Sequence, residues 1–207
     1  MKTQTKLPAA NFDNKIYAKF SGKTIEKKKV NKVLFQQEFG LREDGKAMLV
    51  AITVQLTEKN GFGVLQNFLS GIETLNTQLV VLGSGTATFR KVIFDFQKKH
   101  PHDVAILETG EENLRKIYAA SDVSIFFVRN GESEREIQNS SGYGCVPIAP
   151  ESFVGICENY NPNLESGNSF LFAEQNFFSA FAATVRAAEH FRFPFDWRLI
   201  CKNAMET

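Results

Sequence analysis

Short, uninterrupted runs of apolar residues alternate along this chain with segments in which apolar residues recur every three or four positions. The runs predict strands that are buried on both faces, and the periodic segments predict helices with one apolar face. The predicted strands are residues 47–54, 79–82, 103–107, 123–128, 145–149 and 169–172. The predicted helices are residues 27–39, 61–74, 86–100, 111–120, 132–143, 174–191 and a last one that starts at Pro194.

This alternation of strands and helices predicts an α/β fold. We expect a three-layer, Rossmann-like domain over residues 27–207, with a mostly parallel sheet, helices on both faces and residues 79–82 as the central strand. Residues 1–26 contain several helix and strand breakers and predict an irregular N-terminal arm. Ile16, Tyr17 and Phe20 are the side chains expected to anchor this arm to the domain.

The sequence also predicts which face of one helix is buried and where one long loop lies. The helix over residues 27–39 is expected to turn Val30, Val33, Leu34 and Gln37 inward. The basic residues Lys27, Lys28, Lys29 and Lys32 then form a solvated helix face, with phosphate binding as the alternative. The segment over residues 151–167, rich in Asn, Pro and Glu, predicts a long surface loop.

Composition and charge narrow the classes of function. With 24 Lys and Arg against 23 Asp and Glu, the net charge of +1 predicts no general attraction to nucleic acid or to a membrane. No apolar run approaches the roughly 20 residues that span a bilayer, and the N-terminus does not resemble a signal peptide. The three cysteines, Cys145, Cys157 and Cys201, are widely spaced. They favour reduced thiols in a cytoplasmic compartment and no metal site.

The turn Gly83-Ser-Gly85 is the first candidate for ligand binding. It follows the predicted strand 79–82 directly, and ligands of open α/β sheets bind beyond the carboxyl ends of the strands. The turn lacks the third glycine of the dinucleotide fingerprint and the Gly-Lys-Ser/Thr ending of a phosphate-binding loop. Alone, it is consistent with a purely structural turn or with a phosphate contact.

A series of short motifs is more informative. In chain order these are Leu7-Pro-Ala-Ala, Gly22-Lys23, Asn31-Lys32, Leu34-Phe-Gln36, Phe39-Gly-Leu41, Leu56-Thr57, Gln78-Leu-Val-Val-Leu-Gly-Ser-Gly85, Ile117-Tyr-Ala-Ala-Ser-Asp122, Tyr143-Gly-Cys-Val-Pro-Ile148, Gly167-Asn-Ser-Phe-Leu-Phe172, Trp197 and Asn203-Ala-Met205. The series resembles the C-terminal domain of bacterial-type glycogen and starch synthases, which are glycosyltransferases of the two-domain GT-B fold. The resemblance implies a nucleotide-sugar site for ADP-glucose or UDP-glucose, an α-1,4-glucan acceptor and no cofactor.

The resemblance also implies a set of site residues. The donor-binding candidates are Thr57, Lys59, Gly83, Gly85, Tyr118 and Arg129, and Glu132 is the catalytic candidate. A departing diphosphate needs cations and N–H donors, which the family supplies with an Arg and a Lys. This chain has Gln55 and Asn60 at those two positions, with Lys59 one residue early. Glu132 matches the family's acidic residue with a slip of one position.

Two features of this site have alternative interpretations. The ring of Tyr118 is expected either to stack near the nucleotide base or to pack inside the domain. Three carboxylates, Glu132, Glu134 and Glu136, replace a small-residue stretch of the family and would repel a diphosphate. They would also be the ordinary acidic start of a solvated helix. The family's glycine turn after the fifth strand is reduced to Ser152-Phe-Val-Gly155.

Three hypotheses of function follow. The first is a degenerate donor domain without the N-terminal half of the fold, inactive in glucose transfer by itself. The second is a working half of a split glucosyltransferase that uses Lys59, Arg129 and Glu132 and pairs with a separate N-terminal GT-B domain. The third is a non-catalytic interaction or regulatory module that associates with itself through the face that such a domain would cover.

Overall fold

A six-stranded parallel sheet forms the centre of the computed structural model, which describes residues 7–206. The strands are β1 (Met48–Ile52), β2 (Thr77–Leu82), β3 (Val104–Leu107), β4 (Val123–Ile125), β5 (Val146–Pro150) and β6 (Phe170–Phe172). They lie in the order β3-β2-β1-β4-β5-β6, and every neighbouring pair is parallel. The predicted α/β class and the parallel sheet are confirmed. The prediction of residues 79–82 as the central strand is wrong, because β2 is second from an edge.

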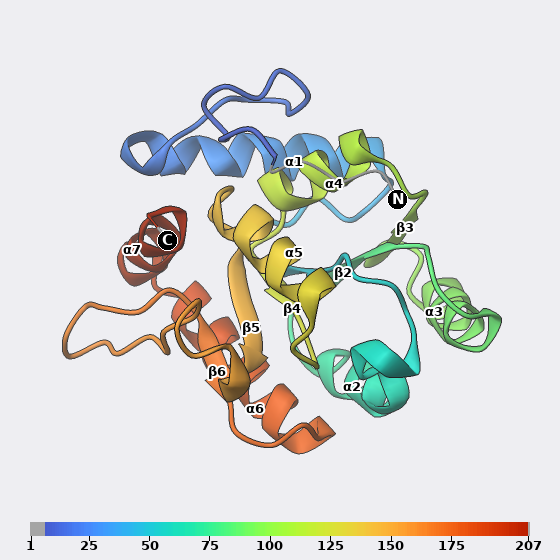
Figure 1. Cartoon of the computed structure of the whole chain (residues 1–207). Coiled ribbons are helices and arrows are strands. Elements are labelled where there is room, and N and C mark those ends of the chain that lie inside the picture. The colour runs from blue at the N-terminus through green and yellow to red at the C-terminus, as the bar shows by residue number, and fades with distance from the viewer. Residues whose placement is uncertain (1–6, 207) are drawn as a thin grey trace.

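Helices cover both faces of this sheet. They are α1 (Lys28–Glu38), α2 (Leu65–Ile72), α3 (Ala87–Lys99), α4 (Glu111–Ala120), α5 (Gly131–Ser141), α6 (Phe177–Phe191) and α7 (Pro194–Met205). Figure 1 shows α1 and α4 side by side on one side of the strands and α2 and α6 on the other. This is the predicted three-layer arrangement. Helices α2 and α6 begin later than predicted, and a 3₁₀ turn, Phe62–Val64, precedes α2.

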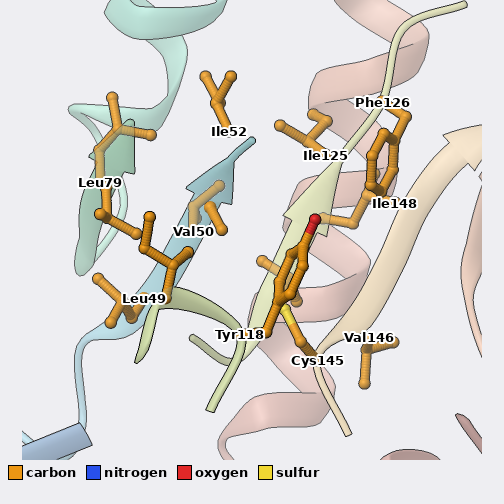
Figure 2. Close-up of a cluster of buried hydrophobic side chains, with 14 of the residues drawn as sticks. Leu49, Val50, Ile52, Leu79, Tyr118, Ile125, Phe126, Cys145, Val146 and Ile148 are labelled. Atoms are coloured by element: carbon orange, nitrogen blue, oxygen red, sulfur yellow. The ribbon is translucent and has the colours of Figure 1, made fainter. Parts of the chain in front are cut away.

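The core follows the apolar runs of the sequence. All five residues of β1 are buried, as are all five of β5. Figure 2 shows side chains of β1, β4 and β5 packed together, with the ring of Tyr118 from α4 among them. Aliphatic strands that are covered on both faces explain why these runs do not alternate with polar residues.

Helix α1 presents the opposite face from the predicted one. Val30, Val33 and Leu34 are 46%, 38% and 37% exposed, and Gln37 is exposed as well. The buried side chains of α1 are Lys28, Asn31, Lys32, Phe35 and Gln36. The predicted inward face is therefore wrong, and so is the solvated position of Lys28 and Lys32, which are only 6% and 4% exposed.

Two lysines explain this orientation of α1. The ammonium group of Lys28 donates hydrogen bonds to the carbonyl oxygens of Tyr118 (2.7 Å), Ala119 (3.1 Å) and Tyr143 (2.9 Å). The first two carbonyls are at the C-terminus of α4, where no intrahelical partner exists and a cation is favourable. Lys32 donates to the carbonyl oxygen of Ala47 and pairs with the carboxylate of Asp122, both at 2.5 Å. These buried charges are compensated, so the polar face packs inward.

The N-terminal arm is irregular over residues 7–21 and ends in a 3₁₀ helix, Gly22–Lys27. Ile16 and Phe20 are buried and Tyr17 is partly buried against the core, as expected. Residues 1–6 of the predicted arm, and residue 207, lie outside the described residues. The predicted loop at 151–167 begins with a 3₁₀ turn, Glu151–Phe153, and is more firmly anchored than expected, because Phe153, Cys157 and Tyr160 are buried.

Candidate functional site

The topology places a crevice between β1 and β4, the two middle strands. The chain leaves β1 toward β2 on one side and leaves β4 toward β5 on the other. Because parallel crossovers are right-handed, α2 and α5 then lie on opposite faces of the sheet. Ligands of open α/β sheets bind at the carboxyl ends of the strands where the order reverses in this way. The loop after β1 and the segment between β4 and α5 therefore form the candidate site.

Asn130 sets the geometry of the α5 side of this crevice. Its side-chain oxygen accepts hydrogen bonds from the backbone N–H groups of Glu132 and Ser133, both at 3.0 Å, and so caps the helix. The hydroxyl of Ser133 in turn accepts from the backbone N–H of Asn130, at 2.9 Å. This reciprocal cap fixes the first turn of α5, which carries Glu132.

Glu132 bridges the crevice to the loop after β1. One carboxylate oxygen accepts from the backbone N–H of Gln55, and the other from the side-chain amide of Asn60, both at 3.0 Å. The amide of Asn60 also donates to the carbonyl of Gln55 (2.8 Å), and its oxygen accepts from the amide of Asn130 (2.8 Å). We call Gln55, Asn60, Asn130 and Glu132 the amide–carboxylate network. Its side chains include no cation.

The neighbouring candidates Thr57 and Lys59 belong to the same loop. The carbonyl of Thr57 accepts from the backbone N–H of Asn60, at 3.1 Å, which starts the 3₁₀ turn Glu58–Asn60. Lys59 is exposed in this turn, whereas Asn60 beside it is buried. Gly61 then takes a left-handed backbone (φ 82°) against Phe127.

The turn Gly83–Gly85 is joined to the same loop through Leu56. The backbone N–H of Leu56 donates to the carbonyl of Ser84, and that of Thr86 donates to the carbonyl of Leu56, both at 3.0 Å. Within the turn, the N–H groups of Gly83 and Ser84 donate to the carbonyls of Leu107 (2.8 Å) and Leu82 (2.7 Å). These backbone donors already have protein acceptors, which is the structural alternative that the sequence left open.

Arg129 lies near the crevice but is bound elsewhere. Its guanidinium donates to the carboxylate of Glu134 (2.6 Å) and to the carbonyl of Ser152, and it packs over the ring of Phe153. The charge of this arginine is thus partly neutralised by Glu134 in the part of the chain that the structure describes.

Tyr118 is fully buried beneath the end of β1. Its hydroxyl lies 2.9 Å from the hydroxyl of Thr53 and donates to the carboxylate of Glu136, at 2.7 Å. Burial, with the negative charge of Glu136 beside it, raises the pKa of this phenol well above its usual value. The sequence allowed the ring of Tyr118 either to stack near a nucleotide base or to pack inside the domain. In this structure the ring packs inside the domain. With 0% of Tyr118 exposed, neither face of the ring is open to a base.

The three predicted carboxylates of α5 do not act as one solvated group. Glu132 belongs to the amide–carboxylate network, and Glu134 is paired with Arg129. Glu136 is buried and receives hydrogen bonds from Tyr118 and Arg135, so its predicted solvated position is wrong. Each carboxylate has its own donors inside the protein.

Sequence reasoning found most members of the site but missed Asn130 and Thr53. The signal for Asn130 was present, because an Asn followed three residues later by Ser is a pattern of reciprocal helix caps. Thr53 carries no local signal, since its role depends on a tyrosine 65 positions away. Within residues 7–206, no group of three or more His, Cys, Asp or Glu is placed to hold a metal ion.

Comparisons with known proteins give this geometry a context. No family model matches the chain. The chain is 29% identical over 193 residues to glycogen synthase 1 of Synechocystis sp.. This alignment covers 90% of the chain and 40% of the relative. The chain is 30% identical over 200 residues to the glycogen synthase of Thermosipho melanesiensis, covering 94% of this chain and 41% of the relative. The chain is homologous to part of the glycogen synthases. It spans about 40% of the length of these curated relatives.

A solved structure supports the fold of this chain. The catalytic domain of starch synthase IV from Arabidopsis thaliana, bound to ADP and acarbose, superposes with a TM-score of 0.84 at 20% identity. The match covers 96% of this chain and 43% of that chain. The resemblance to glycogen and starch synthases is therefore confirmed, and the sheet and helices match a GT-B glycosyltransferase fold. Among the described residues, no helix is both long enough and apolar enough to cross a membrane.

Proposed function

We propose that this chain is a donor-side domain of glycogen or starch synthase type whose phosphate-binding charges have been replaced, and that it does not transfer glucose by itself. The observation that carries the proposal is the amide–carboxylate network. Asn60, which stands where the family has a Lys, donates to Glu132 from its side-chain amide, and Gln55, which stands where the family has an Arg, donates to it from its backbone N–H. The crevice therefore contains a carboxylate held by neutral donors.

This arrangement is electrostatically unsuited to a diphosphate. Glucosyl transfer from a nucleotide sugar leaves negative charge on the departing phosphates, and fixed cations must stabilise that charge. Two unit charges of like sign about 4 Å apart repel by roughly 4 kcal/mol near a protein surface. A diphosphate beside Asn60 would face Glu132 and would have to break the network to obtain its donors.

The remaining donors of the site support the same proposal. Arg129 already binds Glu134 and the carbonyl of Ser152, so recruiting it would leave Glu134 without its partner. The backbone N–H of Gly83 donates to Leu107 at the end of the neighbouring strand β3, and that of Ser84 donates to Leu82 at the end of β2. Lys59 is exposed in its turn, and a lone exposed cation contributes little binding energy because water and salt screen it.

The test is a calorimetric titration with ADP, UDP, ADP-glucose and UDP-glucose, together with an assay of labelled glucose incorporated into glycogen. The glycogen synthase of Thermosipho melanesiensis serves as the active control. We expect no transfer by this chain and a Kd for each nucleotide above about 1 mM, which corresponds to roughly −4 kcal/mol. Incorporation above background, or micromolar binding of a nucleotide sugar, contradicts the proposal.

Two variants decide which residues act if binding is found. Lys59→Ala and Arg129→Ala remove the cations that a working site would need, whereas Lys29→Ala removes an exposed cation of α1. Loss of nucleotide binding in the first two variants, with none in the third, would show that Lys59 and Arg129 act as improvised phosphate ligands and would overturn the proposal. Equal behaviour of all three variants would show that the binding does not depend on these two cations.

A further inference from the structure

A cavity of about 660 Å³ lies apart from the crevice, beside the edge strand β6. It is open to solvent and is lined by the loop over residues 151–159, the end of β6 and one face of α6. None of the residues that line it belongs to the amide–carboxylate network or to the donor-binding candidates. Its volume is in the range of small-molecule sites in proteins.

Arg186 is the charged group of this cavity. It comes from the middle of α6, is partly buried, and is oriented by two hydrogen bonds: one to the side-chain oxygen of Asn159 (3.2 Å) and one to the carbonyl of Leu171. These bonds use only part of the five N–H donors of a guanidinium. Asn159 is itself fixed, because its oxygen also accepts from the backbone N–H of Leu171, at 2.9 Å.

The charge of Arg186 has no anionic partner among residues 7–206. Both of its acceptors are neutral oxygens, and burial lowers the pKa of its guanidinium. Glu151 and Glu158 line the same cavity but form no ion pair with Arg186 in the described part of the chain. Removing a charge from water without pairing it is costly. A guanidinium held in a fixed orientation, with free donors facing a cavity, suits a phosphate or carboxylate that binds two N–H groups at once.

Besides the cationic Arg186, the lining of the cavity includes one hydroxyl group and two carboxylates. Ser179 lies two turns before Arg186 on the same face of α6, and Glu151 and Glu158 line the cavity from exposed positions in the loop. Hydroxyl and carboxylate groups hydrogen-bond well to the hydroxyl groups of a sugar. The two carboxylates also disfavour a ligand that carries several negative charges spread along its length.

We infer that this cavity is a binding site for a small sugar monophosphate, with the phosphate on Arg186 and the sugar hydroxyls on Ser179, Glu151 and Glu158. The site is separate from the crevice and does not depend on whether that crevice binds a nucleotide. A ligand of this class occupies only part of 660 Å³, so water fills the remaining space.

The first experiment uses the unaltered chain. Phenylglyoxal, which modifies arginines, is applied with and without ribose 5-phosphate, and the rate at each arginine is read by peptide mass spectrometry. We expect ribose 5-phosphate to slow modification of Arg186 at least fivefold and to leave the exposed Arg192 unchanged. Uncharged ribose should protect less than twofold, and inorganic phosphate should protect only at higher concentration. Equal rates at Arg186 with and without ribose 5-phosphate overturn the inference.

The second experiment compares matched variants by calorimetry. Arg186→Gln should weaken ribose 5-phosphate binding at least tenfold, and Ser179→Ala should weaken it by a smaller factor. Arg192→Gln removes the same charge from an exposed position at the end of α6 and should bind as the wild type does. Equal weakening by Arg186→Gln and Arg192→Gln would show only a general charge effect and contradict the site. ADP that fails to compete with ribose 5-phosphate separates this cavity from the crevice.

Discussion

The carboxylate of Glu132 accepts a hydrogen bond from the side-chain amide of Asn60 at 3.0 Å, across the crevice between the two middle strands. The bond joins the loop after β1 to the first turn of α5, elements that are 72 residues apart in sequence. In a site built for a diphosphate, the position of Asn60 would carry a cation directed at the ligand. Here the same position satisfies a carboxylate of the protein, so the network joins the two sides of the crevice without a ligand.

Reversing the charge of the crevice should create nucleotide binding. The double variant Gln55→Arg/Glu132→Gln adds a cation at an exposed position and removes the opposing carboxylate, while the glutamine can still accept from Asn60. A hydrogen bond to a charged group contributes about 1.5–3 kcal/mol. We therefore expect the affinity for ADP, measured by calorimetry, to rise at least about tenfold.

The control for this gain is Asn67→Arg/Glu73→Gln, which makes the same net change of charge on and just after α2. It should leave ADP binding within about twofold of the wild type. A similar gain in both variants would mean that net charge, rather than the arrangement of the crevice, limits binding.

The buried face of α1 gives a prediction of stability. Lys32→Met leaves the carboxylate of Asp122 buried and unpaired, and among residues 7–206 the backbone N–H of Leu49 is then its one donor. Breaking a buried pair by removing one partner typically costs about 3–5 kcal/mol. We expect a loss of this size in the free energy of unfolding, measured with urea.

Lys29→Met is the matched control, because Lys29 is the exposed neighbour on the same helix. An exposed substitution of this kind should change the free energy of unfolding by less than about 0.5 kcal/mol. If the two variants lose equal stability, the ion pair of Lys32 and Asp122 is not what fixes the face of α1.

The sequence was sufficient for the number and type of elements, because each strand is a continuous apolar run and each helix has its own periodicity. It was not sufficient for the face of α1. Val30, Val33 and Leu34 have the spacing of a buried stripe, yet Lys28 and Lys32 pack inward. Apart from the carbonyl of Ala47, their partners are 90 or more positions away in sequence, so no local pattern could reveal them.

The candidate site shows the same limit. The resemblance indicated that Gln55 and Asn60 replace two cations, but not that the side chain of Asn60 and the backbone N–H of Gln55 would both bind Glu132. The sequence allowed Tyr118 to stack on a base or to pack inside, and only its bonds to Thr53 and Glu136 distinguish the two. The binding roles of Thr57, Lys59, Gly83, Gly85 and Arg129 and the catalytic role of Glu132 stay predictions.

The buried thiols predict a loss of stability at alkaline pH. Cys145, Cys157 and Cys201 are unbridged and buried, and burial raises the pKa of each to about 12 from about 9. Between these values the unfolded chain has released thiol protons that the native chain retains. Because the unfolded state then binds fewer protons, the free energy of unfolding falls as pH rises.

The slope from one thiol is at most about 1.4 kcal/mol per pH unit. Urea unfolding of the wild type and of Cys201→Ala at several values between pH 8 and pH 10.5 isolates this contribution, since the other titrating groups are common to both. We expect the stability of the variant to fall less steeply above pH 9. Parallel curves would show that Cys201 loses its proton as readily in the folded chain as in the unfolded one.

The contact between Gly85 and Leu56 predicts the most sensitive glycine of the site. Gly85 has φ of 144°, and a Cβ placed there would lie 2.5 Å from the carbonyl oxygen of Leu56. In Gly85→Ala, the alanine would therefore have to adopt a backbone conformation that is unfavourable for it. Its Cβ would also push the turn away from the loop after β1. We expect a loss of at least about 2 kcal/mol in the free energy of unfolding.

Gly45→Ala is the control, because Gly45 lies in an exposed turn with no atom within 4 Å of the added Cβ. Its free energy of unfolding should stay within about 0.5 kcal/mol of the wild type. If Gly85→Ala is equally mild, the turn has room to move, and its backbone N–H groups are then available to a ligand after all.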